Sequence, residues 1–293
     1  MEDRSSGVST VSEAFSQVRN ASYDELVERI AWIEEGHVPL GYILPFPIEK
    51  RVVLYWFCLL AYYATGGAEV PHENQLKAAL ASYEGQDSLV IAGTGSGKTL
   101  VIALLLLINA VPERISITVS PLKRLQITQT ENFNVKYSIK TVAINDDTPR
   151  NIEWWRDNVH NGKKGASQMT TASHFMVTAE QLFKSSEGHF SRLGLLVQDH
   201  GFRKRIGRIH VDEIHFTWFA RTGRYGLDAF RKAWGRLGDL KLQLPSSIPW
   251  QGLTATCPPH VLHFIESSLL NPGYALIRMT SNRPNTMYAR HCQ

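Results

Sequence analysis

Cysteine is scarce in this sequence, and its positions exclude a disulfide framework and the common zinc sites. The three cysteines, Cys58, Cys257 and Cys292, lie far apart, and no C-x-x-C pair occurs among the 293 residues. The common zinc sites use closely spaced cysteine pairs, and a disulfide framework uses several paired cysteines, so neither is suggested here. Because disulfides belong to oxidising compartments, we expect an intracellular protein, nuclear or cytoplasmic, that is not secreted.

Long hydrophobic runs are also lacking. The longest, V-V-L-Y-W-F-C-L-L-A-Y-Y-A at residues 52–64, is shorter than the roughly 20 residues that span a bilayer. The opening residues, M-E-D-R-S-S-G-V-S-T, are too polar and acidic for a secretory signal. We therefore predict that residues 52–64 form a buried or interface helix and that the protein has no membrane partner.

The sequence has neither a strong excess of one charge nor the patterns of two large hydrolase classes. Its 31 basic and 27 acidic residues leave a formal net charge of +4, which permits nucleic-acid binding without demonstrating it. No G-x-S-x-G element marks a serine nucleophile, and no H-x-x-x-H pair on an acidic helix marks a catalytic zinc site. The 43% of hydrophobic residues is enough for a buried core of ordinary globular type.

Two regions of the chain differ in pattern. Residues 12–37 carry apolar side chains at helical spacing, and a proline-rich turn and the helix of residues 52–64 follow them, so residues 1–68 are predicted to be a helical N-terminal extension. From residue 69 onward, short β-rich runs alternate with helical segments. The runs are S-L-V-I-A, I-S-I-T-V-S, K-T-V-A-I, F-M-V-T-A, R-I-H-V-D and P-W-Q-G-L-T-A. This alternation predicts an α/β fold with a parallel sheet flanked by helices.

A phosphate-binding loop stands out in the second region. The residues A-G-T-G-S-G-K-T at 92–99 follow a predicted strand and open a predicted helix, which is the context that a P-loop requires. Gly95 and Gly97 allow backbone N–H groups to turn toward phosphate oxygens. Lys98 can reach the β and γ phosphates, and the Thr99 hydroxyl can bind Mg²⁺. ATP and Mg²⁺ are therefore the predicted ligands of Ala92, Gly93, Thr94, Gly95, Ser96, Gly97, Lys98 and Thr99.

Two adjacent carboxylates end another predicted strand. In R-I-H-V-D-E-I-H at residues 208–215, Asp212 and Glu213 follow the apolar run, and ligands of α/β sheets bind at such strand ends. With the P-loop upstream, we predict that Asp212 holds Mg²⁺ and that Glu213 polarises the water that attacks the γ-phosphate. Lys98, Asp212 and Glu213 are thus the predicted catalytic residues.

Further sequence blocks complete a resemblance to the RecQ family of superfamily-two, DEAD/DEAH-like DNA helicases. The blocks are S-P-L-K-R-L-Q-I-T-Q at 120–129, V-T-A-E-Q-L at 177–182, D-E-I-H at 212–215, G-L-T-A-T at 252–256 and S-N-R-P-N at 281–285. Gln75 precedes the P-loop at the spacing of the family's adenine-binding glutamine. The blocks occur in the family's order, and they resemble its first RecA-like lobe, a P-loop NTPase fold that binds ATP.

The resemblance implies roles for residues outside the P-loop. Gln75 would hydrogen-bond the adenine, and His215, Thr254 and Thr256 would couple the state of the ATP site to the nucleic acid. The residues that would contact DNA are Ser120, Pro121, Leu122, Thr178 and Trp218. The ring of Trp218 and those of its aromatic neighbours could stack on bases or pack in the core, and both alternatives stay open. The implied partner is DNA, single-stranded or duplex with a 3′ tail.

The chain departs from the family's pattern in two places. P-H-E at residues 71–73 stands where the family has F-R-P, so His72 replaces an arginine near the adenine site. After the D-E-I-H box, residues 216–226 lack the G-H-D of the family's aromatic loop. We therefore expect an altered nucleotide affinity and an altered coupling of DNA binding to hydrolysis.

The sequence ends where a second RecA-like lobe of the family would begin. Residues 69–281 would form the ATP-binding domain, and residues 282–293 would start a linker to an absent second lobe. In the family that lobe supplies an arginine finger, which contributes roughly 10³–10⁵ in rate. We therefore expect this chain to bind ATP but to hydrolyse it very slowly, unless a partner supplies a second lobe.

The predicted function is that of the ATP-binding lobe of an ATP-dependent 3′-to-5′ DNA helicase of RecQ type. One alternative is an inactive module that holds nucleotide or nucleic acid and couples them to nothing. The other is an RNA-dependent ATPase of the DEAD-box type, against which the S-P-L, V-T-x-E-x-L and N-R-P-N blocks argue.

Overall fold

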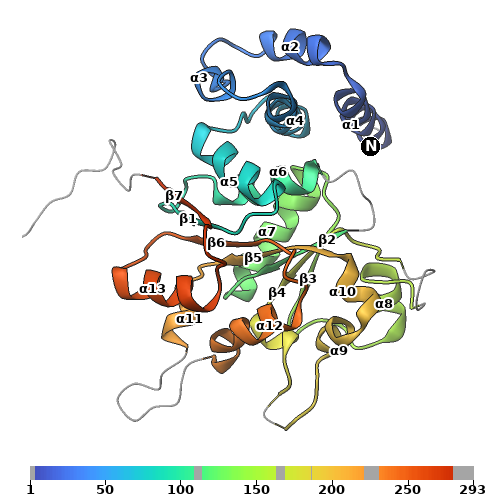
Figure 1. Ribbon diagram of the computed structural model, residues 1–293. Helices are drawn as coiled ribbons and strands as arrows, with labels where there is room; N and C mark the ends of the chain where they lie inside the picture. Colours follow the sequence, from blue (N-terminus) through green and yellow to red (C-terminus); the bar gives the residue numbers. More distant parts are fainter. Residues whose placement is uncertain (1–3, 109–113, 163–168, 186, 221–230, 280–293) are drawn as a thin grey trace, which may run out of the picture.

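The computed structural model describes residues 4–108, 114–162, 169–185, 187–220 and 231–279. Its centre is a seven-stranded parallel sheet in the order β3-β4-β2-β5-β6-β1-β7 (Figure 1). The strands are β1 (Ser88–Ile91), β2 (Ile115–Val119), β3 (Thr141–Ile144), β4 (His174–Val177), β5 (Ile206–Asp212), β6 (Trp250–Thr254) and β7 (Ala275–Arg278). The predicted α/β class with a parallel sheet is confirmed.

Six of the seven strands lie in the runs predicted from the sequence. These runs are rich in Val and Ile, and all five residues of β2 are buried, as expected of a parallel strand covered on both faces. The strand β7 was not predicted. It pairs only with β1 at the edge of the sheet, and Leu276 is 42% exposed, so it is less completely buried than an inner strand such as β2.

Helices cover both faces of the sheet, and further helices precede it (Figure 1). The N-terminal helices are α1 (Arg4–Asn20), α2 (Tyr23–Ala31), α3 (Leu40–Ile43) and α4 (Ile48–Ala64). One face is covered by α5 (Glu73–Tyr83), α6 (Lys98–Leu107) and α7 (Lys123–Val135). The opposite face carries α8 (Ile152–Asn158), η2 (Ala179–Leu182), α9 (Arg192–Gln198), α10 (His200–Arg205), α11 (Phe216–Phe219), η3 (Lys232–Arg236), α12 (Leu237–Gln243) and α13 (Pro259–Ser268).

The start of α2 shows how the local sequence sets the N-terminal helices. Ser22 accepts a hydrogen bond from the backbone N–H of Glu25 at 3.3 Å, and the Glu25 carboxylate accepts one from the Ser22 N–H at 2.7 Å. This reciprocal capping box satisfies two N–H groups that have no partner within the helix. The helix then buries Leu26 and Ile30, one turn apart, so the predicted amphipathic stripe is the face that packs.

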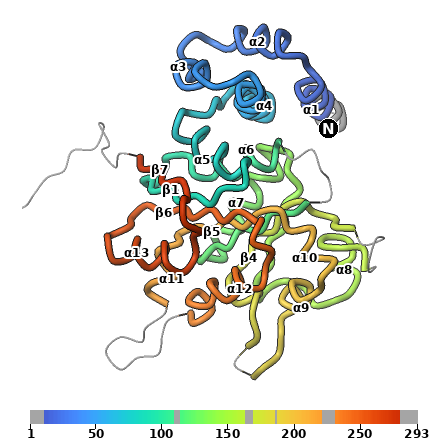
Figure 2. Tube along the Cα trace, in the orientation of Figure 1, coloured from blue at the N-terminus to red at the C-terminus, as the bar shows by residue number. Residues whose placement is uncertain are grey.

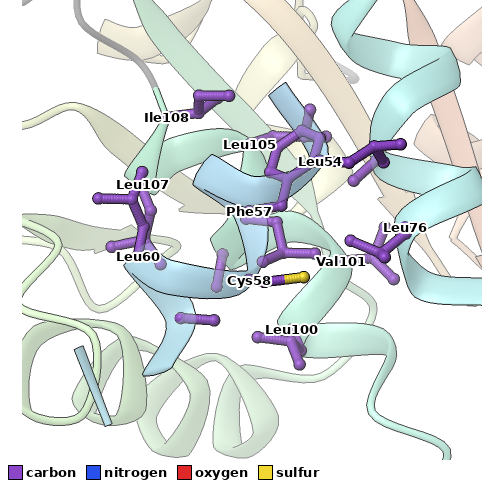
Figure 3. Packing of buried hydrophobic residues seen from close by; sticks show 14 of the residues in the cluster. Leu54, Phe57, Cys58, Leu60, Leu76, Leu100, Val101, Leu105, Leu107 and Ile108 are labelled. Atoms are coloured by element: carbon purple, nitrogen blue, oxygen red, sulfur yellow. The ribbon is translucent and has the colours of Figure 1, made fainter. Parts of the chain in front are cut away.

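The N-terminal helices share one apolar core with the helices on the sheet. Leu54, Phe57 and Leu60 of α4 are fully buried in the same cluster as Leu105 of α6 (Figure 3). Figure 2 shows the consequence for the chain path, in which α1 to α4 lie over α5 and α6. The predicted boundary at residue 68 therefore separates two sequence patterns, while the hydrophobic core continues across it.

The run at residues 52–64 forms most of the buried face of α4, as predicted from its sequence. In the described part of the chain, no helix combines the length and the apolar character that crossing a membrane requires.

The shared core predicts that damage to α4 destabilises the whole domain. Phe57→Ala should lower the free energy of unfolding by about 3–5 kcal/mol, because a fully buried ring leaves a cavity. Urea unfolding followed by far-UV circular dichroism should remain a single transition. Trp32→Ala is the control, because Trp32 is 75% exposed and its loss should change the free energy by less than about 0.5 kcal/mol. Separate melting of the N-terminal helices, with the transition of the sheet unchanged, would contradict the shared core.

Candidate nucleotide-binding site

The predicted site residues meet because the strands are parallel. The carboxyl ends of β1, β6, β5 and β2 lie side by side at one edge of the sheet. The P-loop follows β1, Thr254 ends β6, Asp212 ends β5 and Ser120 follows β2. Segments that are more than 100 residues apart in the chain are thereby brought to one place.

Two glycines of the P-loop have backbone angles that favour glycine. Gly95 and Gly97 have φ values of 82° and 75°, in the left-handed region. At Gly97 a side chain is also excluded by contact, because an added Cβ would lie 2.3 Å from Nε2 of Gln75. Gly97 is the N-cap of α6, so the helix N-terminus, with its unpaired N–H groups, begins at Lys98.

The loop fits a polyphosphate. No atom of the described residues lies within 4 Å of a Cβ built on Gly93 or Gly95, so the space beside the loop is open. The buried hydroxyl of Ser96 has no hydrogen-bond partner in the described structure. Nζ of Lys98 lies over the loop, donating to the carbonyls of Ala92 at 2.8 Å and Gly93 at 3.1 Å. Backbone N–H groups, a hydroxyl and an ammonium group are the donors that phosphate oxygens require.

Gln75 lies against the P-loop. Its side chain is buried, and Nε2 donates to the carbonyls of Ser96 at 3.3 Å and Gly97 at 3.2 Å. Its Oε1 accepts a hydrogen bond from the backbone N–H of His72 at 2.8 Å. Gln75 therefore connects the start of α5 to the loop, a role that the sequence did not indicate. Its contact with adenine stays a prediction.

A cavity of about 670 Å³ opens beside the loop. This volume lies within the range of roughly 300–1,000 Å³ typical of small-molecule sites. Gly95, Gly97 and Thr99 line one end of the cavity, and Gly36 and His37, between α2 and α3, line another part. Its remaining wall includes Glu69, Lys136 and Tyr137.

Glu69 fixes that wall through two contacts. Its carboxylate pairs with Lys136 at 2.6 Å and accepts a hydrogen bond from the Tyr137 hydroxyl at 2.8 Å. Burial, and then this hydrogen bond, raise the pKa of Tyr137, which keeps the phenol protonated and donating. The N-terminal extension, through Gly36 and His37, and the segment that follows α7 take part in the cavity, which the sequence did not predict.

Asp212 is a buried carboxylate with two hydrogen bonds. It is 7% exposed, and it accepts from Nε2 of Gln129 at 3.3 Å and from the backbone N–H of Glu213 at 3.1 Å. Burial, and then the neighbouring charge of Glu213, raise the pKa of Asp212. A cation beside Asp212 would offset both causes, so the residue fits a Mg²⁺ ligand. Magnesium usually takes only one or two carboxylates together with phosphate oxygens, which agrees with the pair predicted here, Asp212 and Thr99.

Glu213 is in a different environment from Asp212. Its backbone has a φ of 52°, a conformation that is unfavourable for a residue with a side chain and that occurs often at functional sites. Its Oε2 lies 3.2 Å from Nδ1 of His215. This contact is the main reason that the pKa of Glu213 is lowered, so the carboxylate is ionised at neutral pH and able to accept a proton.

The three predicted coupling residues form one hydrogen-bonded chain. Nδ1 of His215 lies 2.8 Å from the Thr254 hydroxyl, which donates to the carbonyl of Thr256 at 2.9 Å. Because the hydroxyl proton goes to that carbonyl, the Thr254 oxygen accepts from His215 and also from the Thr256 N–H at 3.3 Å. The other histidine near the acidic pair, His210, is fully buried against Gln251, with its pKa lowered to about 3 by burial, and it has no part in the site.

The residues predicted to contact DNA have mixed surroundings. The side chains of Ser120 and Thr178 are buried, whereas Leu122 is 55% exposed at the sheet edge. Pro121 is buried, and its carbonyl accepts a hydrogen bond from Arg231. Trp218 is half-buried, with its ring 5.4 Å from His260 and 5.5 Å from Phe264 of α13. The structure thus shows the packing alternative for this ring. The S-N-R-P-N block lies outside the described residues.

Comparison with known proteins shows which part of the sequence resembles a known family. The profile of the family described as DEAD/DEAH box helicase matches residues 72–216, from the start of α5 to just past the acidic pair. The ATP-dependent DNA helicase Q-like 4B of Arabidopsis thaliana is 28% identical over 216 residues, which is 74% of this chain and 17% of that protein. The ATP-dependent DNA helicase hus2/rqh1 of Schizosaccharomyces pombe is 27% identical over 247 residues, which is 84% of this chain and 17% of that protein.

Solved structures agree with the fold. The DUF1998 helicase MrfA bound to DNA and AMPPNP superposes with a TM-score of 0.52 at 16% identity, over 76% of this chain and 29% of that one. S. cerevisiae Dbp5 bound to RNA and ADP BeF3 gives a TM-score of 0.50 at 16% identity, over 76% of this chain and 50% of that one. At such identities the likeness concerns the fold alone, which is that of a first RecA-like helicase lobe. The chain spans about a sixth of the length of the two curated relatives.

The contact between Gly97 and Gln75 yields a test with a matched control. Gly97 and Gly85 both have a left-handed backbone, with φ values of 75° and 81°. Gly97→Ala and Gly85→Ala should therefore each lower the free energy of unfolding by about 1–2 kcal/mol. No atom of the described structure is near the added Cβ at Gly85, whereas Gly97→Ala displaces Gln75. Titration with a fluorescent ATP analogue should therefore show a loss of about tenfold or more for Gly97→Ala only. Equal affinities in the two variants would show that the contact with Gln75 does not support the loop.

Proposed function

We propose that the chain is the ATP-binding lobe of an ATP-dependent DNA helicase of RecQ type that translocates 3′ to 5′, because the profile described as DEAD/DEAH box helicase matches residues 72–216. The observation that carries the proposal is the meeting of Lys98, Asp212, Glu213 and the His215–Thr254 pair at one sheet edge. We propose DNA and not RNA as the substrate because the curated relatives at 27–28% identity are named DNA helicases.

Each residue at this edge has a distinct task in the proposed reaction. Lys98 and the loop N–H groups bind and orient the β and γ phosphates of ATP. Thr99 and Asp212 hold Mg²⁺, which when bound neutralises charge on the phosphate oxygens. Glu213 orients the attacking water and accepts its proton, for which its lowered pKa leaves it ionised.

Coupling to nucleic acid is assigned to His215 and Thr254. Nδ1 of His215 lies 3.2 Å from Oε2 of Glu213 and 2.8 Å from the Thr254 hydroxyl, so movement at the γ-phosphate reaches the end of β6 through two short contacts of one ring nitrogen. His215 also stacks on Phe216 at 4.7 Å, at the start of α11, where the aromatic loop begins. This arrangement connects the water-activating residue to two segments of the sheet edge.

Nucleotide binding should depend on Lys98. Lys98→Ala removes the ammonium group that pairs with phosphate oxygens, and charge-assisted hydrogen bonds of this kind contribute roughly 1.5–3 kcal/mol. A fluorescent ATP analogue with Mg²⁺ should therefore bind at least about tenfold more weakly. Lys204→Ala, at an exposed position of α10, is the control and should bind like the wild type. Equal affinity of Lys98→Ala and the wild type would refute the phosphate role.

Hydrolysis should depend on Glu213 without loss of binding. Glu213→Gln removes the proton acceptor but keeps the size of the side chain, so phosphate release should fall by about 100-fold or more while affinity for ATP is retained. Phosphate release is measured with single-stranded DNA, with RNA and without nucleic acid, beside strand displacement on duplexes with a 3′ or a 5′ tail. Stimulation by RNA alone would favour an RNA-dependent ATPase. Binding of ATP with no turnover under any condition would favour an inactive module.

A further inference from the structure

A second cavity lies at the other end of the sheet edge that carries the P-loop. Its volume is about 1,020 Å³. The loop after β3, the 3₁₀ helix η2 after β4, the start of α9 and η3 enclose it. In the sheet order, β3 and β4 are separated from β1 by β2, β5 and β6. Figure 1 shows α8, α9 and α12 together on the side of the sheet away from the N-terminal helices. Neither the nucleotide site nor the predicted catalytic residues include this cavity.

The lining of this cavity is strongly cationic. Its basic residues are Arg150, Lys184, Arg192, Arg231, Lys232 and Arg236, against the acidic residues Asp146, Glu180 and Glu187. One of the acidic residues already has partners, because Asp146 pairs with Lys123 at 3.3 Å and accepts a hydrogen bond from Gln181 at 3.0 Å. The excess of basic over acidic side chains in the lining favours an anionic ligand.

Two of the arginines are held against aromatic rings. The guanidinium carbon of Arg192 lies 5.2 Å from the ring centroid of Trp155, and that of Arg236 lies 4.6 Å from the ring centroid of Phe183. Both rings are 4% exposed, so they form rigid supports in the wall. Arg192 is fixed further by a hydrogen bond to the carbonyl of Arg150 at 2.9 Å. A guanidinium positioned in this way has a planar face available for stacking and N–H donors in a fixed fork.

These groups match the chemistry of a nucleotide. Phosphate oxygens pair with arginine forks, and unstacked bases lie on guanidinium planes and aromatic side chains. The volume is at the upper end of the range for sites that enclose a small molecule, so a base with its sugar and phosphate has room to enter. A lone phosphate would leave most of this space and its aromatic walls unused.

The cavity adjoins the residues predicted to contact the nucleic-acid strand. Arg231, in its wall, donates to the carbonyl of Pro121, next to Ser120. Gln181, also in the wall, donates its backbone N–H to the carbonyl of Thr178 at 3.0 Å. A strand that follows the predicted contacts at these two loops reaches the cavity along the same edge of the sheet.

We propose that this cavity binds one nucleotide of a single-stranded nucleic acid, with its base stacked on the supported guanidinium groups of Arg192 and Arg236 and its phosphate paired with the surrounding arginines. The proposal rests on the proposed function, because it requires a strand on this edge of the lobe. It adds a site that holds one nucleotide out of line with the rest of the strand.

Two variants test the cavity. Arg192→Lys keeps the positive charge but loses the planar group, whereas Arg236→Gln removes both the guanidinium plane and one charge at a position that is 45% exposed. Fluorescence anisotropy with a labelled oligothymidylate should show affinity roughly 5- to 100-fold weaker for Arg192→Lys, the range for loss of one stacked base. Arg236→Gln should also bind more weakly and should reduce the salt dependence of binding by about one charge. Arg156→Gln, at an exposed position of α8 outside the cavity, should match the wild type.

A scan with abasic sites tests whether a base enters the cavity. Oligothymidylates of about 12 nucleotides, each with one abasic site, should bind the wild type more weakly at one position than at the others, and Arg192→Lys should remove this difference. Thermal melting reports whether each variant is folded. If Arg192→Lys does not fold, Arg236→Gln is used in its place in the scan. Uniform binding across the scan, with wild-type affinity in Arg236→Gln, overturns the nucleotide cavity. Failure of the wild type to bind any single strand contradicts the proposed function itself.

Discussion

The parallel direction of all seven strands is the constraint on which the site depends. Because every strand ends at the same edge, the carboxyl ends of β1, β5 and β6 bring the P-loop, the acidic pair and Thr254 to one location. A single reversed strand would carry its functional residue to the opposite edge, roughly the length of a strand away. The buried Val and Ile runs that favour a doubly covered parallel sheet are therefore the physical basis of the geometry of the candidate site.

Adjacent carboxylates acquire different properties from their surroundings at this edge. Asp212 ends a buried strand, and burial raises its pKa, whereas Glu213 is turned by its left-handed backbone toward His215, which lowers its pKa. Two groups of nearly the same intrinsic chemistry are thereby suited to different tasks, one to a cation and the other to a proton. The opposite pKa shifts of the two carboxylates arise from the contacts around each residue and not from the residue types.

The N-terminal helices contribute to the candidate nucleotide site as well as to the core. Their core is continuous with that under α6, the helix that begins at the P-loop, so displacing α4 would displace the support of the loop. The turn between α2 and α3 also lines the cavity beside the loop. Segments outside the region matched by the helicase profile therefore contribute to the surroundings of the nucleotide.

The sequence by itself determined the elements whose signals are local. Residues 92–99 carry their own turn and helix start, Asp212 and Glu213 follow an apolar run, and six strands coincide largely with short runs rich in β-forming residues. Only the tertiary structure decided which distant residues meet. The hydrogen bonds of Gln75 to the loop, the contact of Gln129 with Asp212 and the packing of Trp218 on α13 join residues with no common local pattern. The edge strand β7 and the arginine-lined cavity were not predicted for the same reason. Each is defined by pairing or packing between segments far apart in the chain, and such contacts leave no periodic signal in the sequence.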